Sequence, residues 1–448
     1  MAGSNQADQN DIENPYISLA NSMRKGFNSL SPPSSECCIY RVPQRLRSVN
    51  EKLCTPQAVS IGPLHHGKEG LNVVLEEHKQ KYLQDFIGRT NVSLEDYIKK
   101  IKDHEARLRR CYGEPIKFSS DEFVTIILVD AAFVIELLLK HYFNICFNIW
   151  DENDRIFDKP YMIQDVWPDM WLLENQLPFF ILEDLFDPQK ITLPANADNN
   201  GITEGLSIIS LSFSFIKHLL PVDKLEDNLE TFRSVAHIVD LFRKIFKLHQ
   251  PLESAGGELP SSIPSLTELQ HAGVKFEAQQ GENIFDIRFS STDGVLKIPR
   301  FPLGFFTEIM RNVLVFEQLH YPMSEDNYMS QYVSLMGGLV KTSGDVELLI
   351  EYGIALAERH LLRGKYEGFT SLLVNSLFID VPIDVGNFYY AHVCDELNKY
   401  YSKRWNKWKA ILRQNYFNTP WATISVIAAV VLLILTLIQT VASVVSAT

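Results

Sequence analysis

The chain has 448 residues, of which 46% are hydrophobic, 11% aromatic and 22% charged. This composition is typical of a globular protein and excludes disorder as the overall state. The 42 basic and 55 acidic residues give a formal net charge of −13, so the field of the whole protein repels nucleic acid and we expect no nucleic-acid partner.

The N-terminal segment combines a polar arm with a stretch rich in cysteine and histidine. Residues 1–35 end in SLSPPSS and are typical of a flexible arm. Residues 37–67 contain three cysteines and the pair His65 and His66, but the six cysteines of the chain form no C-x-x-C motif. Adjacent histidines diverge on a regular element, so a shared metal is disfavoured. We interpret the stretch as a structural turn and expect neither a metal nor a cofactor.

Helices are expected through the first half of a globular domain that spans residues 36–413. The spacing of apolar residues predicts helices over 72–87 and 91–113. Residues 123–143 are almost continuously apolar but carry Asp130, Glu136 and Lys140, which are costly at the centre of a bilayer. This stretch is therefore predicted to be the central helix of the globular domain.

Polar residues interrupt the apolar run at 170–186, where Pro178 is expected to break a helix. Glu174, Asn175 and Gln176 lie together inside this run. Because buried polar groups need partners, a structural hydrogen-bond network is the favoured interpretation, and a ligand site is the alternative.

In the second half of the chain, the spacing of apolar residues changes once from a helical to an alternating pattern. Helical spacing predicts helices over 229–246, 305–317 and 327–341, and polar stretches at 193–205 and 250–265 are possible insertions or linkers. Residues 274–303 alternate between apolar and polar side chains around the turn sequence STDG, which predicts a β-hairpin or small sheet. The expected fold class is mainly α with a small β element, an α+β protein.

Three polar residues share one side of the helix predicted at 305–317: Glu308, Arg311 and Asn312. An ion pair that holds the helix against its neighbours is the favoured interpretation. A pair of carboxylates for acid–base catalysis is the alternative, but no spacing in the sequence fixes their separation.

Residues 421–445 contain no charged side chain. As a helix they would extend about 37 Å, which is enough to cross a hydrocarbon core of about 30 Å. Basic and aromatic residues typical of a membrane interface precede or begin the span: Lys403, Arg404, Trp405, Lys407, Trp408, Lys409, Arg413 and Trp421. We predict a C-terminal transmembrane anchor and no signal peptide, and the positive charge before the span places residues 1–413 in the cytosol.

Several long blocks resemble one plant family. The segments IYRVPQRLR, VSIGPLHHG, LLENQLPFFILEDL, IFDIRFSSTDGVLKIP and TEIMRNVLVFEQ occur in that order. With the C-terminal block they resemble the plant domain of unknown function 247 family over about residues 37–440. The resemblance implies a mostly helical fold, a membrane anchor and no established enzymatic activity. Some members of that family are pollen-side determinants of self-incompatibility in grasses that recognise small secreted proteins.

The expected function is therefore that of a non-catalytic recognition or signalling protein at the plasma membrane, with a protein or a small secreted peptide as its partner. A secreted partner would require the globular domain to face outward, against the charge bias. The alternative is a membrane-bound enzyme with a cleft near Glu174–Gln176 or near His65 and His66.

Overall fold

The structure is a computed structural model in which a defined set of residues is described. These residues are 16–28, 34–47, 51, 54–71, 73–149, 154–192, 206–216, 232, 234–248, 256–280, 283–303, 305–321, 327–356, 386–403 and 420–447. The predicted insertion at 193–205 and the interface residues Arg404, Trp405, Lys407, Trp408, Lys409 and Arg413 lie outside this set.

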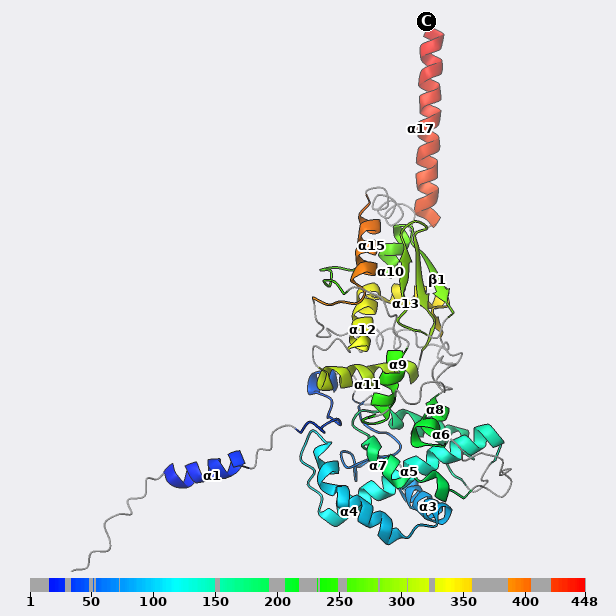
Figure 1. The fold of residues 1–448 in the computed structure, drawn as a ribbon. Helices are drawn as coiled ribbons and strands as arrows, with labels where there is room; N and C mark the ends of the chain where they lie inside the picture. The colour runs from blue at the N-terminus through cyan, green and yellow to red at the C-terminus, as the bar shows by residue number, and fades with distance from the viewer. Residues whose placement is uncertain are drawn as a thin grey trace, which may run out of the picture.

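The N-terminal part of the globular domain is helical and is built around α5 (Figure 1). Its elements are α2 (Gln44–Arg47), α3 (Val73–Thr90), α4 (Leu94–Arg110), α5 (Ser120–Phe147), α6 (Pro160–Met170), α7 (Phe179–Leu185), η2 (Pro188–Lys190) and α8 (Ile208–Ile216). Helices α3, α4, α7 and α8 all pack on α5. A capping box between Ser119 and Glu122 starts α5, whose apolar side chains are almost all buried. The prediction that 123–143 is a core helix is therefore confirmed.

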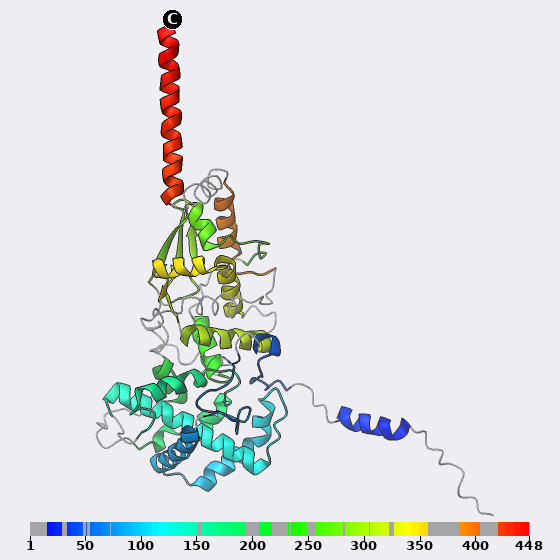
Figure 2. The same cartoon turned by 180° about the vertical axis from the view of Figure 1, so that it is seen from behind.

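The C-terminal part combines helices with a small sheet (Figures 1 and 2). Its elements are α10 (Leu266–His271), β1 (Lys275–Gln279), β2 (Arg288–Ser290), β3 (Val295–Pro299), β4 (Phe301–Pro302), α12 (Tyr328–Leu339), α13 (Ser343–Glu351), β5 (Ala355–Leu356) and α15 (Ala391–Ser402). Strands β2 and β3 form the predicted hairpin, and β1 pairs with β3 in parallel, so the order is β1-β3-β2. Helices and small sheets together confirm the α+β class.

Two helices lie between these parts: α9 (Ile238–Leu248) and α11 (Phe305–His320), which pack on each other. Helix α9 begins later than the predicted start at residue 229, which lies outside the described residues. Ser234 has a positive φ of 69°, and the Asp240 carboxylate accepts a hydrogen bond from the Ala236 N–H at 2.9 Å. Because Ser234 is left-handed and the Asp240 side chain takes the Ala236 N–H, the helix starts no earlier than Ile238.

The predicted arm and linker are only partly described. Helix α1 (Tyr16–Asn28) lies within the predicted arm and stands apart from the globular domain in both ribbon views (Figures 1 and 2). In the predicted linker at 250–265, Gly257 pairs with Phe388 and Ser265 caps α10, whereas residues 250–255 lie outside the described set.

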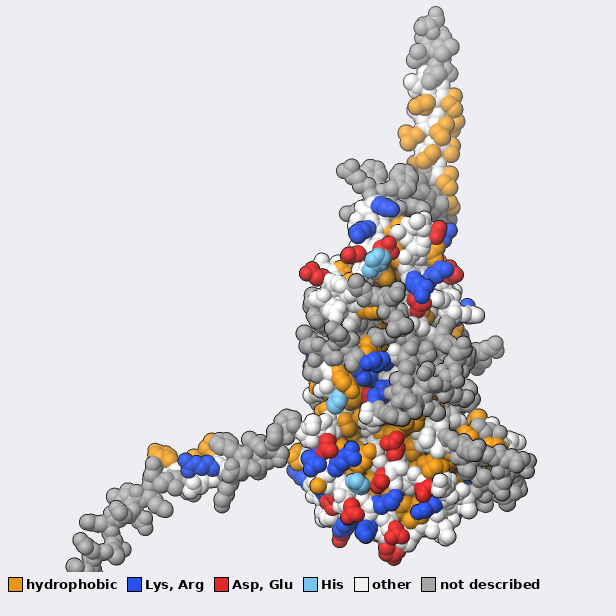
Figure 3. Space-filling model, viewed as in Figure 1, with side chains coloured by type: hydrophobic (Ala, Val, Ile, Leu, Met, Phe, Trp, Pro, Cys, Tyr) orange, Lys and Arg blue, Asp and Glu red, His pale blue; other side chains and the backbone are white. Residues whose placement is uncertain are grey.

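Helix α17 (Pro420–Ala447) extends away from the end of the molecule that carries the sheet (Figures 1 and 2). Its side chains are described at 424, 425 and 427–440, and the large apolar ones among them are exposed (Figure 3). In the part of the chain that the structure describes, no helix is long and apolar enough to cross a membrane. The transmembrane helix expected at 421–445 therefore stays a prediction.

Candidate functional site

Residues 54–67, which we call the buried loop, run through the N-terminal part without regular secondary structure. Most of the loop is buried, and Val59 and Ser60 have no exposed surface. A buried backbone that has no helix or strand partners must find other hydrogen-bonding groups. Side chains from three surrounding segments supply them.

Four side-chain acceptors receive N–H groups of the buried loop, and one of them is Glu76 of α3, which accepts from the Ser60 N–H at 3.1 Å. Asp169 of α6 accepts from three consecutive backbone groups, at 3.0 Å from Gln57, 2.7 Å from Ala58 and 2.8 Å from Val59. Asn175 accepts from Ile61 at 2.7 Å, and Asp130 of α5 accepts from Gly62 at 2.8 Å. Burial raises the pKa of Asp169 to about 6, although these N–H donors lower it.

Lys79 of α3 supports the same loop from the other side. Its side chain is 2% exposed. The ammonium donates to the Ser60 carbonyl at 2.9 Å and lies 2.7 Å from Asp130 and 2.6 Å from Glu76. Its three N–H donors therefore already have partners, and the pair with Asp130 compensates two buried charges.

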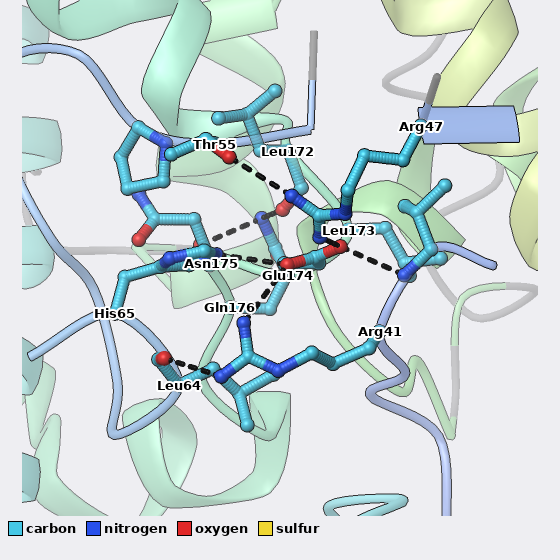
Figure 4. Close-up of polar contacts among 12 residues, drawn as sticks. Arg41, Arg47, Thr55, Leu64, His65, Leu172, Leu173, Glu174, Asn175 and Gln176 are labelled. Carbon is cyan, nitrogen blue, oxygen red and sulfur yellow. Dashed lines mark hydrogen bonds and ion pairs between the residues drawn. The ribbon is translucent and has the colours of Figure 1, made fainter. Parts of the chain in front are cut away.

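Glu174 is the centre of a second buried network (Figure 4). Its carboxylate has no exposed surface and accepts hydrogen bonds from four groups. The donors are Val42 N at 2.7 Å, His65 Nε2 at 2.9 Å, Arg41 Nη1 at 3.3 Å and Arg47 Nη2. Sequence segments more than 100 residues apart are joined at this one side chain.

Opposing effects act on the pKa of Glu174. Burial raises it, but hydrogen bonds from His65 and from the Val42 N–H, together with the charge of Arg47, lower it below its usual value. The group is therefore held as a carboxylate. Because four donors occupy its oxygens and water has no access, the carboxylate is not available to take a proton from a substrate.

Asn175 and Gln176 also have structural partners. The Asn175 amide donates to the carbonyls of Val59 at 3.0 Å and Asp169 at 2.9 Å. The Gln176 amide donates to the Met170 and Leu172 carbonyls and accepts from the Ile238 N–H at 3.1 Å. These contacts favour the structural-network interpretation of residues 174–176.

Asn312 links α11 to the segment at 173–176, since its side-chain Oδ1 accepts from the Leu173 N–H at 2.9 Å. Its amide donates to the Glu308 carbonyl at 3.0 Å, and Arg311 donates to the Leu46 carbonyl at 2.8 Å. Burial, together with the Asp169 charge, raises the pKa of Glu308 to about 7, against the lowering by Trp171 and Arg311. The structure thus brings the two groups of polar residues expected from the sequence to neighbouring positions.

The two adjacent histidines point to different environments. His65 is buried and contacts Glu174, whereas His66 is exposed and packs edge-on against Phe118 with ring centroids 5.7 Å apart. Over the described residues, no group of three or more His, Cys, Asp or Glu side chains is placed to hold a metal ion.

A cavity of about 390 Å³ lies beside His66, between α3 and α5. It falls at the lower end of the size range of small-molecule sites. Its lining residues are His66, Glu76, Lys79, Gln80, Phe118, Asp121, Glu122, Thr125, Ile126, Val129 and Asp130.

Sequence reasoning missed Asp169 and Lys79 as parts of these networks, whereas Arg41 and Arg47 were expected to form either a solvated face or a clamp for acidic neighbours, and both pair with Glu174. One signal was available for Lys79, which lies on the buried face of its helix beside Leu75 and Tyr82. A charge at that spacing predicts a buried partner. Asp169 carries no such signal, because its partners Gln57, Ala58 and Val59 are distant in the sequence.

The geometry defines a class of protein: an α+β fold, mainly helical, in which buried charged side chains hold an irregular loop in the core. The chain belongs to the DUF247 family, described as plant protein of unknown function, whose model matches residues 39–435.

Two curated relatives from Arabidopsis thaliana cover most of the chain. The UPF0481 protein At3g47200 is 28% identical over 93% of this chain and 88% of its own length. The putative UPF0481 protein At3g02645 is 23% identical over 90% of this chain and 89% of its own length. No solved structure matches.

Proposed function

We propose that this protein is a non-catalytic recognition protein, held at a plant membrane by α17, that binds a protein or peptide partner. The observation that carries the proposal is the exposed apolar surface of α17, where Leu433 is 70% and Leu437 is 68% exposed. Isolated apolar residues are common on protein surfaces, but a helix that is apolar on all sides requires a bilayer or a partner to cover it.

The sequence around α17 supports a bilayer as the cover. Residues 421–445 carry no charge, and six basic residues lie between Lys399 and Arg413 without an acidic one. This charge bias favours a globular domain on the cytosolic side, with the plasma membrane as the proposed location.

The contacts of Glu174–Gln176 favour binding over catalysis in that region. All three side chains are buried and engaged with backbone and side-chain partners. An enzyme would need an accessible acid, base or nucleophile, which this segment does not offer. The cavity beside His66 keeps a membrane-bound enzyme as the second candidate.

The anchor is tested by extraction of the tagged full chain from plant membranes with alkaline carbonate. We expect the wild-type chain to stay in the membrane pellet. The double variant Leu433→Arg/Leu437→Arg should move to the supernatant, because each arginine at the centre of a span costs about 3 kcal/mol. The control Ile145→Arg, on a half-exposed position of α5, should stay in the pellet. Release of the wild-type chain would overturn the anchor.

Sidedness decides where the partner is found. With a tag near residue 10, protease applied to intact cells should leave the tag intact if the globular domain is cytosolic. Digestion of the tag would place the domain outside, contradict the charge argument and favour a small secreted partner, as in the self-incompatibility members of the family.

A further inference from the structure

We propose that the cavity between α3 and α5 receives a basic side chain, lysine or arginine, of the partner protein. This inference rests on the proposed recognition function and names the chemistry of its contact. The cavity is lined by apolar and acidic groups that together match a flexible apolar stem with a cationic end.

The apolar wall comes from α5 and the segment before it. Ile126 and Val129 are 4% and 8% exposed and face the cavity on one side of α5. Phe118 and the edge-on ring of His66 form the adjoining aromatic wall. Methylene groups of a lysine or arginine would pack on this wall, and aromatic faces also attract cations.

The charge of the lining favours a cation over an anion. Four carboxylates line the cavity, those of Glu76, Asp121, Glu122 and Asp130, against the single ammonium of Lys79 among these lining residues. The three N–H donors of the Lys79 ammonium are taken by Ser60, Glu76 and Asp130, so none is left for an anionic ligand.

Glu76 and Asp121 are the carboxylates that an incoming cation meets. The Glu76 side chain is 29% exposed and is held by Lys79 at 2.6 Å and by Ser60, whereas the Asp121 side chain is 89% exposed and pairs through one oxygen with Lys102 at 2.6 Å. Asp130 lies deeper, with 1% of its side chain exposed, and is bound by Lys79 and the Gly62 N–H. A guanidinium at the cavity entrance would donate charge-assisted hydrogen bonds to these two carboxylates, in addition to the bonds that they already accept.

The test is a titration of the full chain in detergent with Nα-acetyl-L-arginine amide, followed by the methyl resonances of Ile126 and Val129. We expect saturable shifts of these methyl groups. The neutral isostere Nα-acetyl-L-citrulline amide should bind at least about tenfold more weakly, since it lacks the charge. Equal affinity for the two probes, or an absence of shifts at Ile126 and Val129, would overturn the proposal.

Matched variants locate the carboxylates that matter. Glu76→Gln should weaken binding of the arginine probe by about tenfold, whereas Glu77→Gln, an exposed neighbour outside the cavity, should leave it unchanged. Asp121→Asn, on an exposed position, provides a second test if Glu76→Gln lowers the melting temperature. Unchanged affinity in both cavity variants contradicts the assignment.

This titration needs neither a membrane nor the natural partner. A negative result together with carbonate-resistant membrane association would remove the cavity assignment and leave the anchor in place. If the chain binds the arginine probe specifically but is extracted by carbonate, the cavity assignment stands and the anchor is removed.

Discussion

Single buried charges hold distant segments together in this fold. Glu174 joins Arg41, Arg47, His65 and the backbone of Val42 through one carboxylate that has no exposed surface. Removal of this carboxylate is costly, because the Arg47 side chain, which is only 16% exposed, loses its compensating charge, whereas Arg41 is 40% exposed and keeps Glu114. The stability of this region therefore depends on a few side chains rather than on a long interface.

We expect Glu174→Gln to lower the free energy of unfolding by about 3–5 kcal/mol, because two arginines lose their carboxylate. The measurement is the urea midpoint of the full chain in detergent. The control is Glu114→Gln, which removes the exposed partner of Arg41 and should cost less than about 1 kcal/mol. Similar midpoints for the two variants would contradict the structural role of Glu174.

Glu317 of α11 is expected to make the stability of the chain depend on pH. Its carboxylate caps α12 by accepting from the backbone N–H groups of Met329 at 3.1 Å and Ser330 at 2.9 Å. Burial raises the pKa of Glu317 to about 7, although these donors and the charge of Arg243, 3.8 Å away, lower it. Asp240 and Lys244 of α9 are charged groups near Arg243 on the facing helix.

The raised pKa of Glu317 fixes the direction in which stability changes with pH. The folded chain binds more protons than the unfolded chain between about pH 4.3 and pH 7, so the contribution of Glu317 is present below that window and is lost as pH rises through it. Relative to Glu317→Gln, the wild type should therefore lose about 3 kcal/mol of stability between pH 4 and pH 8. Urea midpoints across this range measure the difference, and the exposed substitution Glu347→Gln is the control. A pH-independent gap between Glu317→Gln and wild type would contradict the prediction.

At the scale of elements, the buried loop is the least regular part of the core and is held by side chains from α3, α5 and α6. Gly62 lies in the left-handed region with φ of +77°. A Cβ built there would lie 2.6 Å from the Gln176 carbonyl oxygen and 3.1 Å from the Tyr112 hydroxyl. Only glycine satisfies both the dihedral angle and the close approach.

Gly62→Ala should therefore destabilise the chain by more than about 2 kcal/mol, the sum of dihedral strain and a backbone clash. Gly67→Ala is the matched control, because Gly67 has φ of +72° but no atom within 4 Å of its Cβ position. Its cost should be about 1 kcal/mol. Thermal unfolding of the two variants separates clash from strain, and equal losses would show that the close approach to Gln176 is unimportant.

At the scale of the whole molecule, the N-terminal and C-terminal parts are joined through α9 and α11. Phe179 N donates to the Ala236 carbonyl at 2.7 Å, and the contacts of Gln176 with Ile238 and of Asn312 with Leu173 also join the N-terminal part to α9 and α11, while α11 packs on α12 and β4 of the C-terminal part. Since these hydrogen bonds are buried, separation of the parts would leave several polar groups without partners.

We therefore expect both parts to unfold in one transition. Hydrogen exchange measured along a urea series should give α5 and α13 the same midpoint in the wild type. Asn312→Ala should shift both midpoints to lower urea together by removing the acceptor of Leu173, whereas the exposed control Glu347→Gln should shift neither. Different wild-type midpoints for α5 and α13 would show that the parts are independent.

The sequence predicted the elements whose information is local. The apolar run around residues 123–143 predicted α5, Pro178 stands directly before the first residue of α7, and the alternation around STDG predicted the β2–β3 hairpin. Each rests on spacing within a few turns or on the backbone limits of one residue. The late start of α9 was not predictable in this way, because apolar spacing continued through a residue that adopts a left-handed conformation.

By itself, the sequence determined the α+β class, the family and the uncharged C-terminal run, since periodicity, motif order and composition are properties of the linear chain. Tertiary structure decided which partners the charges have: Glu174 with Arg41 and Arg47, and Lys79 with Asp130. It also decided that His65 lies in the core while His66 lines a cavity. The physical reason is that burial and ion pairing depend on segments 50 to more than 100 residues apart, and no local pattern records which segments meet.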